Sequence, residues 1–561
     1  MFVIFPRFSS SFLAFSLACA LAGCTGNFHR KWADREVYGI LRQKSAKVPN
    51  AGDGLLNIDP PGPLSLEALR KSIKTEEFLG DRAFIEKDAR VIGLADALQY
   101  GVERNRTYLG QKENVYQEAL DLTDVRHDFA LIPHAIGNGR YNLTKDSING
   151  IVTRRTLTEH SDTGFTALQS TGALIATNLA TDFVKLITGK LTSPGDSRLT
   201  ATLTQPLLKG AGVLSVTEPL TQQERNVLYA IRDFAEYRKT FTINVTTQFY
   251  QTLQLRASAH NAYLAYQAFK KLINQQTELT KANVPGRTFT ALGLLQQAEL
   301  TYHRNWINAV KAYEVGLDDL KLTLGLPVNE RILLDQKELE RLVLIDPKGT
   351  LEEALQTAMV TRNDLWNQRD AVEDAARHVR IAKQNLLPVL NAVVEYTAPS
   401  KAANKLQFDS RQHGFTVGAD VDLHLDQKPV RNDLRSAQIA EQRAQRNLDL
   451  AEENVRRDVR TSWRNLDLAR KQFELAGQSV KLNEVRLARE EDYDREGRGQ
   501  ARDLIDAQAA LIQAHDDLGD ALVNHTVARI QLWKDMGILF IKKDGRWEDV
   551  LSKESPQGKH D

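Results

Sequence analysis

Cysteine is almost absent from this chain of 561 residues, which contains only Cys19 and Cys24. Both lie near the N-terminus, so no disulfide framework can support the rest of the chain. Long apolar runs are also missing after this N-terminal stretch, because no later segment approaches the ~18 apolar residues of a transmembrane helix. The formal net charge is only +1 and the basic residues are spread along the chain, which argues against a nucleic-acid partner.

Signatures of catalysis are equally scarce. The 12 histidines are scattered, and His515 and His525 do not have metal-ligand spacing. The chain contains no HExxH, GxSxG or Walker sequence. We therefore expect no enzymatic activity, no bound metal and no cofactor.

The N-terminus has the pattern of a bacterial lipoprotein signal. A basic residue, Arg7, precedes the apolar stretch Phe12–Ala22, and "LAGC" ends at Cys24. This pattern predicts that residues 1–23 are removed as a signal peptide and that Cys24 is the lipidation site. An ordinary signal peptide with an incidental cysteine is the alternative. Thr25 and Gly26 provide no aspartate at the second mature position, the usual inner-membrane retention signal, so we expect a lipid-anchored outer-membrane protein whose helices extend into the periplasm.

Glycine and proline are absent from two long stretches, residues 221–284 and 431–476. Apolar residues recur there at spacings of three and four, which predicts packed helices, and the second helix should continue through Gly477 toward Glu496. The first helix should be on the order of 100 Å long. The predicted seams consist of Val227, Ile231, Phe234, Phe241, Val245, Phe249 and Leu253 in the first stretch, and Leu434, Ala437, Ala444, Leu448, Ala451, Val455, Val459, Leu466 and Phe473 in the second.

The chain repeats itself over residues 91–330 and 348–540. "LADALQ" at Leu94–Gln99 matches "LEEALQ" at Leu351–Gln356, and both copies turn at a Gly-Arg pair after their long helix. The period is far longer than that of a solenoid repeat, so we interpret it as an internally duplicated domain. A leader and linker at residues 24–90, with a helix expected at Leu66–Arg90, precede the copies, and a polar tail at residues 541–561 follows them.

Strand patterns lie between the helices of each copy. In His413–Gln427, apolar residues alternate with Asp420, Asp422 and Asp426, which places the two sets on opposite faces of a sheet. Its expected partner is Val389–Thr397, and in the first copy Ser197–Leu208 should pair with Leu131–Thr144. The insertion between those two, roughly residues 145–194, has no assignment, and the strand pattern alone also fits a water-soluble sandwich.

The order of these elements resembles the TolC family of outer-membrane efflux proteins, in its lipoprotein form. "LTQPLLKGAG" at Leu203–Gly212 is similar to the family's strand-to-helix junction. "GRGQARDLIDAQAAL" at Gly497–Leu511 is similar to its helical tip, as is "GRTFTALGLLQQAEL" at Gly286–Leu300. Each motif alone is weak, and their order within two copies carries the resemblance.

The resemblance implies a mainly α fold with transmembrane β: a homotrimer in which four strands per chain close one twelve-stranded barrel, continuous with a long periplasmic helical barrel. The apolar residues of His413–Gln427 would face outer-membrane lipid, and Asp420, Asp422 and Asp426 would line the lumen. Closure by several chains agrees with the intolerance of lipid for open strand edges.

The family also closes its periplasmic end with acidic residues, which by position fall on Asp503 and Asp506. Their spacing of three places both on one helical face, whereas the first copy has Leu292 and Leu295 at these positions. A solvated helix start rich in aspartate is the alternative. The family's locking arginine corresponds to Gly499 here, although Arg498 and Arg502 lie beside it, so the resemblance does not say how the closed state is held. The tips at Gly286, Arg287, Gly497 and Arg498 would dock a periplasmic adaptor.

The expected function is thus the exit duct of a tripartite efflux system, exporting small molecules received from an inner-membrane pump and an adaptor. The outer-membrane duct of a type I protein secretion system is the alternative. A non-channel coiled-coil envelope lipoprotein is a more remote alternative.

Overall fold

The computed structural model describes residues 26–548, except for 52–55, 60–61, 63–65, 73–75, 147–151, 187–196, 283–288, 343, 345–348, 402–403, 409–410, 424 and 497. The chain divides into two compact units. One comprises residues 1–47, 115–230 and 367–448, and the other 48–114, 231–366 and 449–561. Each unit contains segments of both repeats, so the units do not coincide with the repeats.

The predicted duplication is visible in the helices, which correspond in order and length. The short helices α3 and α9 have 11 residues each, α4 and α10 have 22 each, and α7 and α12 have 35 each. The long helices α6 and α11 have 64 and 68 residues. The bounds in the first copy are α3 Leu94–Arg104, α4 Arg106–His127, α6 Glu218–Lys281 and α7 Phe289–Thr323; in the second they are α9 Leu351–Thr361, α10 Asn363–Gln384, α11 Lys428–Arg495 and α12 Ala501–Asp535.

The two copies also end in the same way. Gly325 follows α7 with φ of 70°, and Gly537 follows α12 with φ of 77°, a conformation that favours glycine. A Cβ atom at Gly325 would lie 2.4 Å from the carbonyl oxygen of Arg104, at the end of α3. A Cβ atom at Gly537 would lie 2.4 Å from the hydroxyl of Thr361, at the end of α9. Both glycines therefore allow the same close approach of two helix ends.

The helical seams are confirmed to different degrees. All seven predicted seam residues of α6 are buried. In α11 only Val455, Val459 and Leu466 of the predicted seam are buried, whereas the positions from Leu434 to Ala451 are half-buried. The first part of α11 is therefore less buried by its own chain than the second part.

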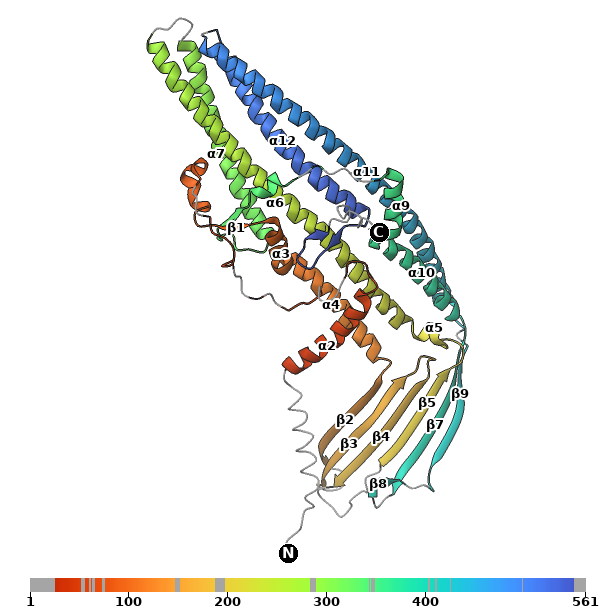
Figure 1. Ribbon diagram of the computed structural model, residues 1–561. Helices are drawn as coiled ribbons and strands as arrows, with labels where there is room; N and C mark the ends of the chain where they lie inside the picture. The colour runs from red at the N-terminus through yellow and green to blue at the C-terminus, as the bar shows by residue number, and fades with distance from the viewer. Residues whose placement is uncertain are drawn as a thin grey trace, which may run out of the picture. The chain divides into compact units, whose positions relative to one another are not determined.

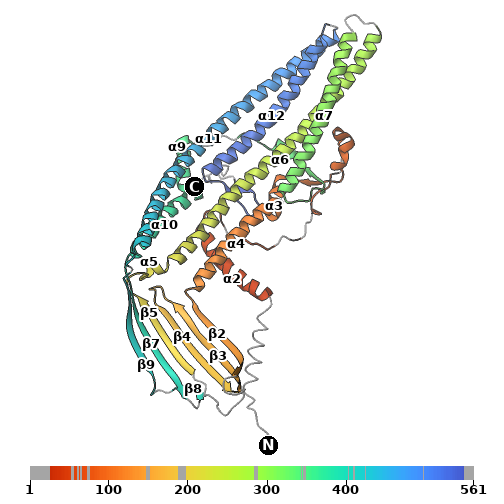
Figure 2. The same ribbon diagram turned by 180° about the vertical axis from the view of Figure 1, so that it is seen from behind.

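One antiparallel sheet of seven strands belongs to the first unit, with strand order β2-β3-β4-β5-β7-β8 and β9 also paired to β7 (Figure 1). The same strands are seen from behind in Figure 2. The strands are β2 Leu131–Asp146, β3 Val152–Leu168, β4 Leu174–Leu186, β5 Ser197–Pro206, β7 Val389–Lys401, β8 Asn404–Phe408 and β9 Gly414–Asp422.

The sheet corrects two expectations for the first copy. Four strands per chain were expected, but the unassigned insertion forms two more, β3 and β4. β2 therefore pairs with β3, not with β5, and β5 pairs with β4 on one side and β7 on the other. The pairing of β7 with β9 agrees with the prediction for the second copy.

The register extends the two-faced pattern of β9 across neighbouring strands. Val417 is opposite Val394, which is in turn opposite Leu203, so these apolar residues share one face. Asp420 is opposite Asn391, on the other face. In β5 that other face carries threonines, namely Thr200, Thr202 and Thr204.

Asp426 does not belong to this sheet, contrary to expectation. β9 ends at Asp422, and the Asp426 carboxylate accepts a hydrogen bond from the backbone N–H of Lys428 at 3.1 Å. Lys428 begins α11, and Pro429 in the first turn favours a helix start. The strong helix-start signal ends the alternating strand earlier than its pattern predicts.

The remaining elements are short apart from α2 (Gly26–Ser45). In the described part of Leu66–Arg90 the helical element is the 3-10 helix η1 (Glu77–Ile85), where a longer helix was expected. The other elements are β1 Arg90–Ile92, α5 Val213–Val216, β6 Ile332–Leu334, α8 Lys337–Glu340, β10 Phe540–Ile541 and β11 Trp547–Glu548. Among the described helices, none has an apolar stretch sufficient to cross a bilayer.

Candidate functional site

Two regions contain the predicted functional residues: the polar face of the sheet and the tip of the second copy. On the polar face, Asp420 and Asp422 are exposed and lie two residues apart in β9. Because every second residue of a strand points to the same side, both carboxylates are on the same face as Asn391 and Glu395 of β7.

The inserted strands add a polar cluster to this face. His134 Nε2 of β2 lies 3.5 Å from Asp162 Oδ1 of β3, and Asn178 of β4 donates a hydrogen bond to Asp162 Oδ2 at 3.0 Å. In the register of the sheet, His134 lies opposite Gly164 of β3, and Asp162 lies opposite Ala180 of β4. Sequence reasoning missed this cluster because two of its three strands lay in the unassigned insertion.

The tip of the second copy places Asp503 and Asp506 in the first turns of α12, where both are exposed. Leu504 and Ala507 are buried on the other side of the same helix. The aspartates therefore share one solvent face, as their spacing predicted. Burial raises the pKa of Tyr302 in α7, and the negative charge of Asp506 raises it further, which places Asp506 close to α7.

The first copy has no acidic counterpart at its tip. Leu295, at the position equivalent to Asp506, is almost completely buried and packs with Phe269 and Ala298. Leu295 therefore stabilises the packing of α7 against α6 instead of facing solvent.

The turn between α11 and α12 explains the glycine at the position of the expected arginine. A Cβ atom at Gly499 would lie 2.7 Å from the backbone nitrogen of Asp494. The N–H groups of Arg498 and Gly499 both donate to the carbonyl oxygen of Tyr493 at 2.9 Å. Arg498 pairs with Glu496 and lies 5.4 Å from the centre of the Tyr493 ring. A larger residue at 499 would require this turn to open.

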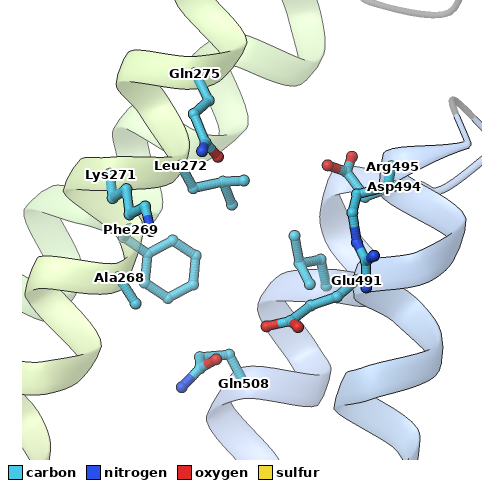
Figure 3. Close-up of a pocket in the computed structure, with 10 residues that line it drawn as sticks. Ala268, Phe269, Lys271, Leu272, Gln275, Glu491, Asp494, Arg495 and Gln508 are labelled. Atoms are coloured by element: carbon cyan, nitrogen blue, oxygen red, sulfur yellow. The ribbon is translucent and has the colours of Figure 1, made fainter.

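A cavity of about 410 Å³ lies between the two helix pairs near this tip (Figure 3). Phe269 and Leu272 of α6 provide an apolar wall, and Glu491, Asp494 and Arg495 of α11 provide a charged wall. Gln276 beside it donates to both carboxylate oxygens of Asp494 at 3.3 Å. The cavity thus combines apolar and charged contacts at the end of the long helices.

Four of the predicted site residues lie outside the described residues: Cys24, Gly286, Arg287 and Gly497. Within the part of the chain that the structure describes, no group of three or more His, Cys, Asp or Glu side chains has the geometry of a metal site.

Comparisons with known proteins agree with this architecture. Residues 354–537 match the family model described as outer membrane efflux protein. No curated protein matches the chain in sequence.

Several solved structures share the fold at low sequence identity. The CmeC outer membrane channel of Campylobacter jejuni is 12% identical, with a TM-score of 0.58 over 85% of this chain and 94% of that one. The open-state MtrE outer membrane channel of Neisseria gonorrhoeae is 14% identical, with a TM-score of 0.58 over 81% and 90%. The outer membrane protein VceC of Vibrio cholerae is 11% identical, with a TM-score of 0.58 over 79% and 96%. The chain therefore has the fold of the TolC-family outer-membrane channels, and residues 354–537 of its second copy match the outer membrane efflux protein model.

Proposed function

We propose that the chain forms the outer-membrane exit duct of a tripartite efflux system, which exports small molecules from an inner-membrane pump and a periplasmic adaptor. The observation that carries this proposal is the sheet, which has one apolar and one polar face and leads into the long helices α6 and α11. An apolar face suits lipid and a polar face suits a water-filled lumen.

The edges of the sheet support a homotrimer. Among the described strands, β2 pairs only with β3 and β9 only with β7, so each leaves one edge open. Open edges are not tolerated in lipid, and copies of the chain can close them into a barrel. Six long strands from each of three chains give a barrel of about eighteen strands, wide enough for an aqueous lumen. The resemblance alone implied twelve.

The helices carry surfaces that suit the same assembly. Leu468, Leu475 and Leu482 of α11 are spaced by seven residues, as in a coiled-coil seam, and are 54%, 64% and 70% exposed. Leu300 and Ile307 of α7 have the same spacing and are also exposed. Two different apolar stripes on one chain fit a cyclic oligomer, in which unlike surfaces of neighbouring copies meet.

The periplasmic aperture is assigned to Asp503 and Asp506 in this proposal. Their exposure on one face of α12 is compatible with two acidic rings around a three-fold axis. The tips at Gly286, Arg287, Gly497 and Arg498 are the proposed adaptor contacts, and the cavity offers apolar and charged groups of α6 and α11 to the same partner.

Cys24 is the proposed lipid anchor, on the basis of "LAGC". Cys24→Ser should abolish incorporation of labelled fatty acid, whereas the protein should remain in the outer-membrane fraction because the barrel inserts independently. Wild-type protein that incorporates no fatty acid would contradict the lipoprotein assignment.

The duct of a type I protein secretion system is the second candidate, and the additional strands favour it because a wider barrel admits larger cargo. Photo-crosslinking from Arg287 and Arg498, followed by identification of the captured proteins, separates the two candidates. Capture of an adaptor with a drug or metal pump supports efflux, whereas capture with a protein-secreting pump supports secretion. Capture of neither would contradict both.

A further inference from the structure

The N-terminal helix α2 presents an aromatic and basic surface that its own fold does not cover. Phe28 and Trp32 are each 56% exposed and their ring centroids are 6.4 Å apart. Residues four apart share one face of a helix, and Arg35 lies one further turn along it. The opposite face is buried, with Val37, Ile40 and Leu41 in the protein interior.

Side-chain contacts fix α2 against α4, from the middle of α4 to its end. The Tyr116 hydroxyl donates to Asp34 at 2.7 Å, and the Tyr38 and Tyr116 rings are 5.8 Å apart. Near the other end of α2, Lys44 pairs with Glu224, which also pairs with Arg126. These contacts hold the helix in a defined orientation within the first unit.

This orientation places Trp32 at the level where helix changes to strand. Together with residues 123–130, Trp32 lines a groove of about 740 Å³. α4 ends at His127 and β2 begins at Leu131, which is itself 59% exposed. If the sheet spans the bilayer, as in the proposed function, this junction is the periplasmic boundary of the membrane.

The chemistry of the surface matches that boundary. Tryptophan is enriched where hydrocarbon meets the headgroups, and basic residues favour anionic headgroups. His29, Arg35, Arg126 and His127 line the groove, against two acidic residues, Glu36 and Asp124. The helix begins two residues after Cys24, so an acylated Cys24 would enter the same leaflet.

We propose that Phe28, Trp32 and Arg35 of α2 dock on the phospholipid headgroups of the inner leaflet of the outer membrane. The helix is then a third membrane contact, besides the sheet and the anchor. It orients each chain around the barrel from the periplasmic side.

Fluorescence quenching by brominated phospholipid in vesicles tests this directly. In vesicles of phosphatidylethanolamine and phosphatidylglycerol, quenching of tryptophan emission should decrease in Trp32→Phe, because the quenched fluorophore is lost. Trp366→Phe is the matched control. Trp366 is 41% exposed near the start of α10, about 30 Å along the chain from β7, and should not be quenched.

The same measurement in the Cys24→Ser background isolates the helix from the anchor. Trp32 should still be quenched there, and equal quenching of wild type and Trp32→Phe would overturn the proposal. Loss of Trp32 quenching in the Cys24→Ser background would also overturn it, because the anchor alone would then hold the helix at the membrane. Conductance measured on the same protein separates this result from the proposed function, since a non-conducting protein can still show Trp32 quenching.

Discussion

Glu86 is completely buried, and its carboxylate is the centre of a charged cluster in the second unit. Arg256 Nε and an Nη atom donate to its two oxygens at 2.7 and 2.8 Å, and the Tyr313 hydroxyl donates at 2.8 Å. Burial and the charge of Glu86 raise the pKa of Tyr313 well above its usual value, which keeps this donor protonated. The cluster joins η1 and its flanking residues to α6 and α7.

Glu86→Gln should destabilise the protein strongly, because it leaves the Arg256 guanidinium buried without its anionic partner. Removal of one member of a buried ion pair typically costs about 3–5 kcal/mol. Glu278→Gln is the control, because Glu278 forms an exposed pair with Lys281 at 2.9 Å, and such pairs contribute about 0–1 kcal/mol. Denaturation of the detergent-solubilised protein measures both changes. Equal changes for the two variants would show that the Glu86 cluster is not structural.

For individual residues, the sequence predicted some features of the site and not others. The spacing of Asp503 and Asp506 predicted a shared helical face, because helical periodicity decides it, and the structure adds that both side chains are exposed. The close approach at Gly499 could not be predicted, because it depends on the path of the turn past Asp494.

At the scale of elements, the long helices were predictable and the inserted strands were not. Absence of glycine and proline with regular apolar spacing predicted α6 and α11 close to their observed bounds. β3 and β4 are rich in threonine and have weak alternation, and a barrel strand gives a much weaker signal than a helix. Their pairing became clear only from the register with β2 and β5.

The two faces of β9 should respond differently to the same charge. Ala419→Arg places a cation on the apolar face and should cost roughly 2–4 kcal/mol near the bilayer centre, and Val421→Arg should behave similarly. Leu423 lies just beyond the end of β9, so the cost there should be smaller. Asp420→Arg is the matched control, because its side chain is on the polar face and should change ion preference instead.

The yield of folded, membrane-inserted protein measures the first effect, and reversal potential measures the second. Equal tolerance of arginine at 419 and 420 would contradict the assignment of the two faces to lipid and lumen.

At the scale of the whole molecule, the account depends on assembly of copies. Leu475→Arg should weaken the trimer, because it places a charge in the exposed stripe of α11 that we expect another chain to cover. Lys481→Glu changes the charge at a nearby exposed position without altering the stripe, and should leave assembly unchanged. Light scattering of the solubilised protein distinguishes trimer from monomer. Trimers of normal stability in Leu475→Arg would place the subunit interface elsewhere.

The duplication and the helices were sufficient to predict the class of fold, whereas the size of the barrel was not predictable. The number of strands depends on how residues 145–194 pair, which no local pattern determines. The trimeric barrel should accordingly have about eighteen strands and a wide outer lumen, so that the periplasmic tip, with Asp503 and Asp506, is the narrowest part.

Single-channel recording of the trimer in a planar bilayer tests this central claim most directly, with wild type compared with the Asp503→Ala/Asp506→Ala double variant. Six carboxylates around one axis should make the wild-type channel cation-selective, and divalent or trivalent cations on the periplasmic side should block it. The double variant should form the same trimer with weaker cation selectivity and weaker block. Both side chains are exposed, so their replacement removes no contact from the helical core. Unchanged selectivity and block would place the constriction elsewhere, with Asp494 and Glu496 the next residues to test. A trimer that conducts no ions at all would contradict the central claim that the protein is a channel.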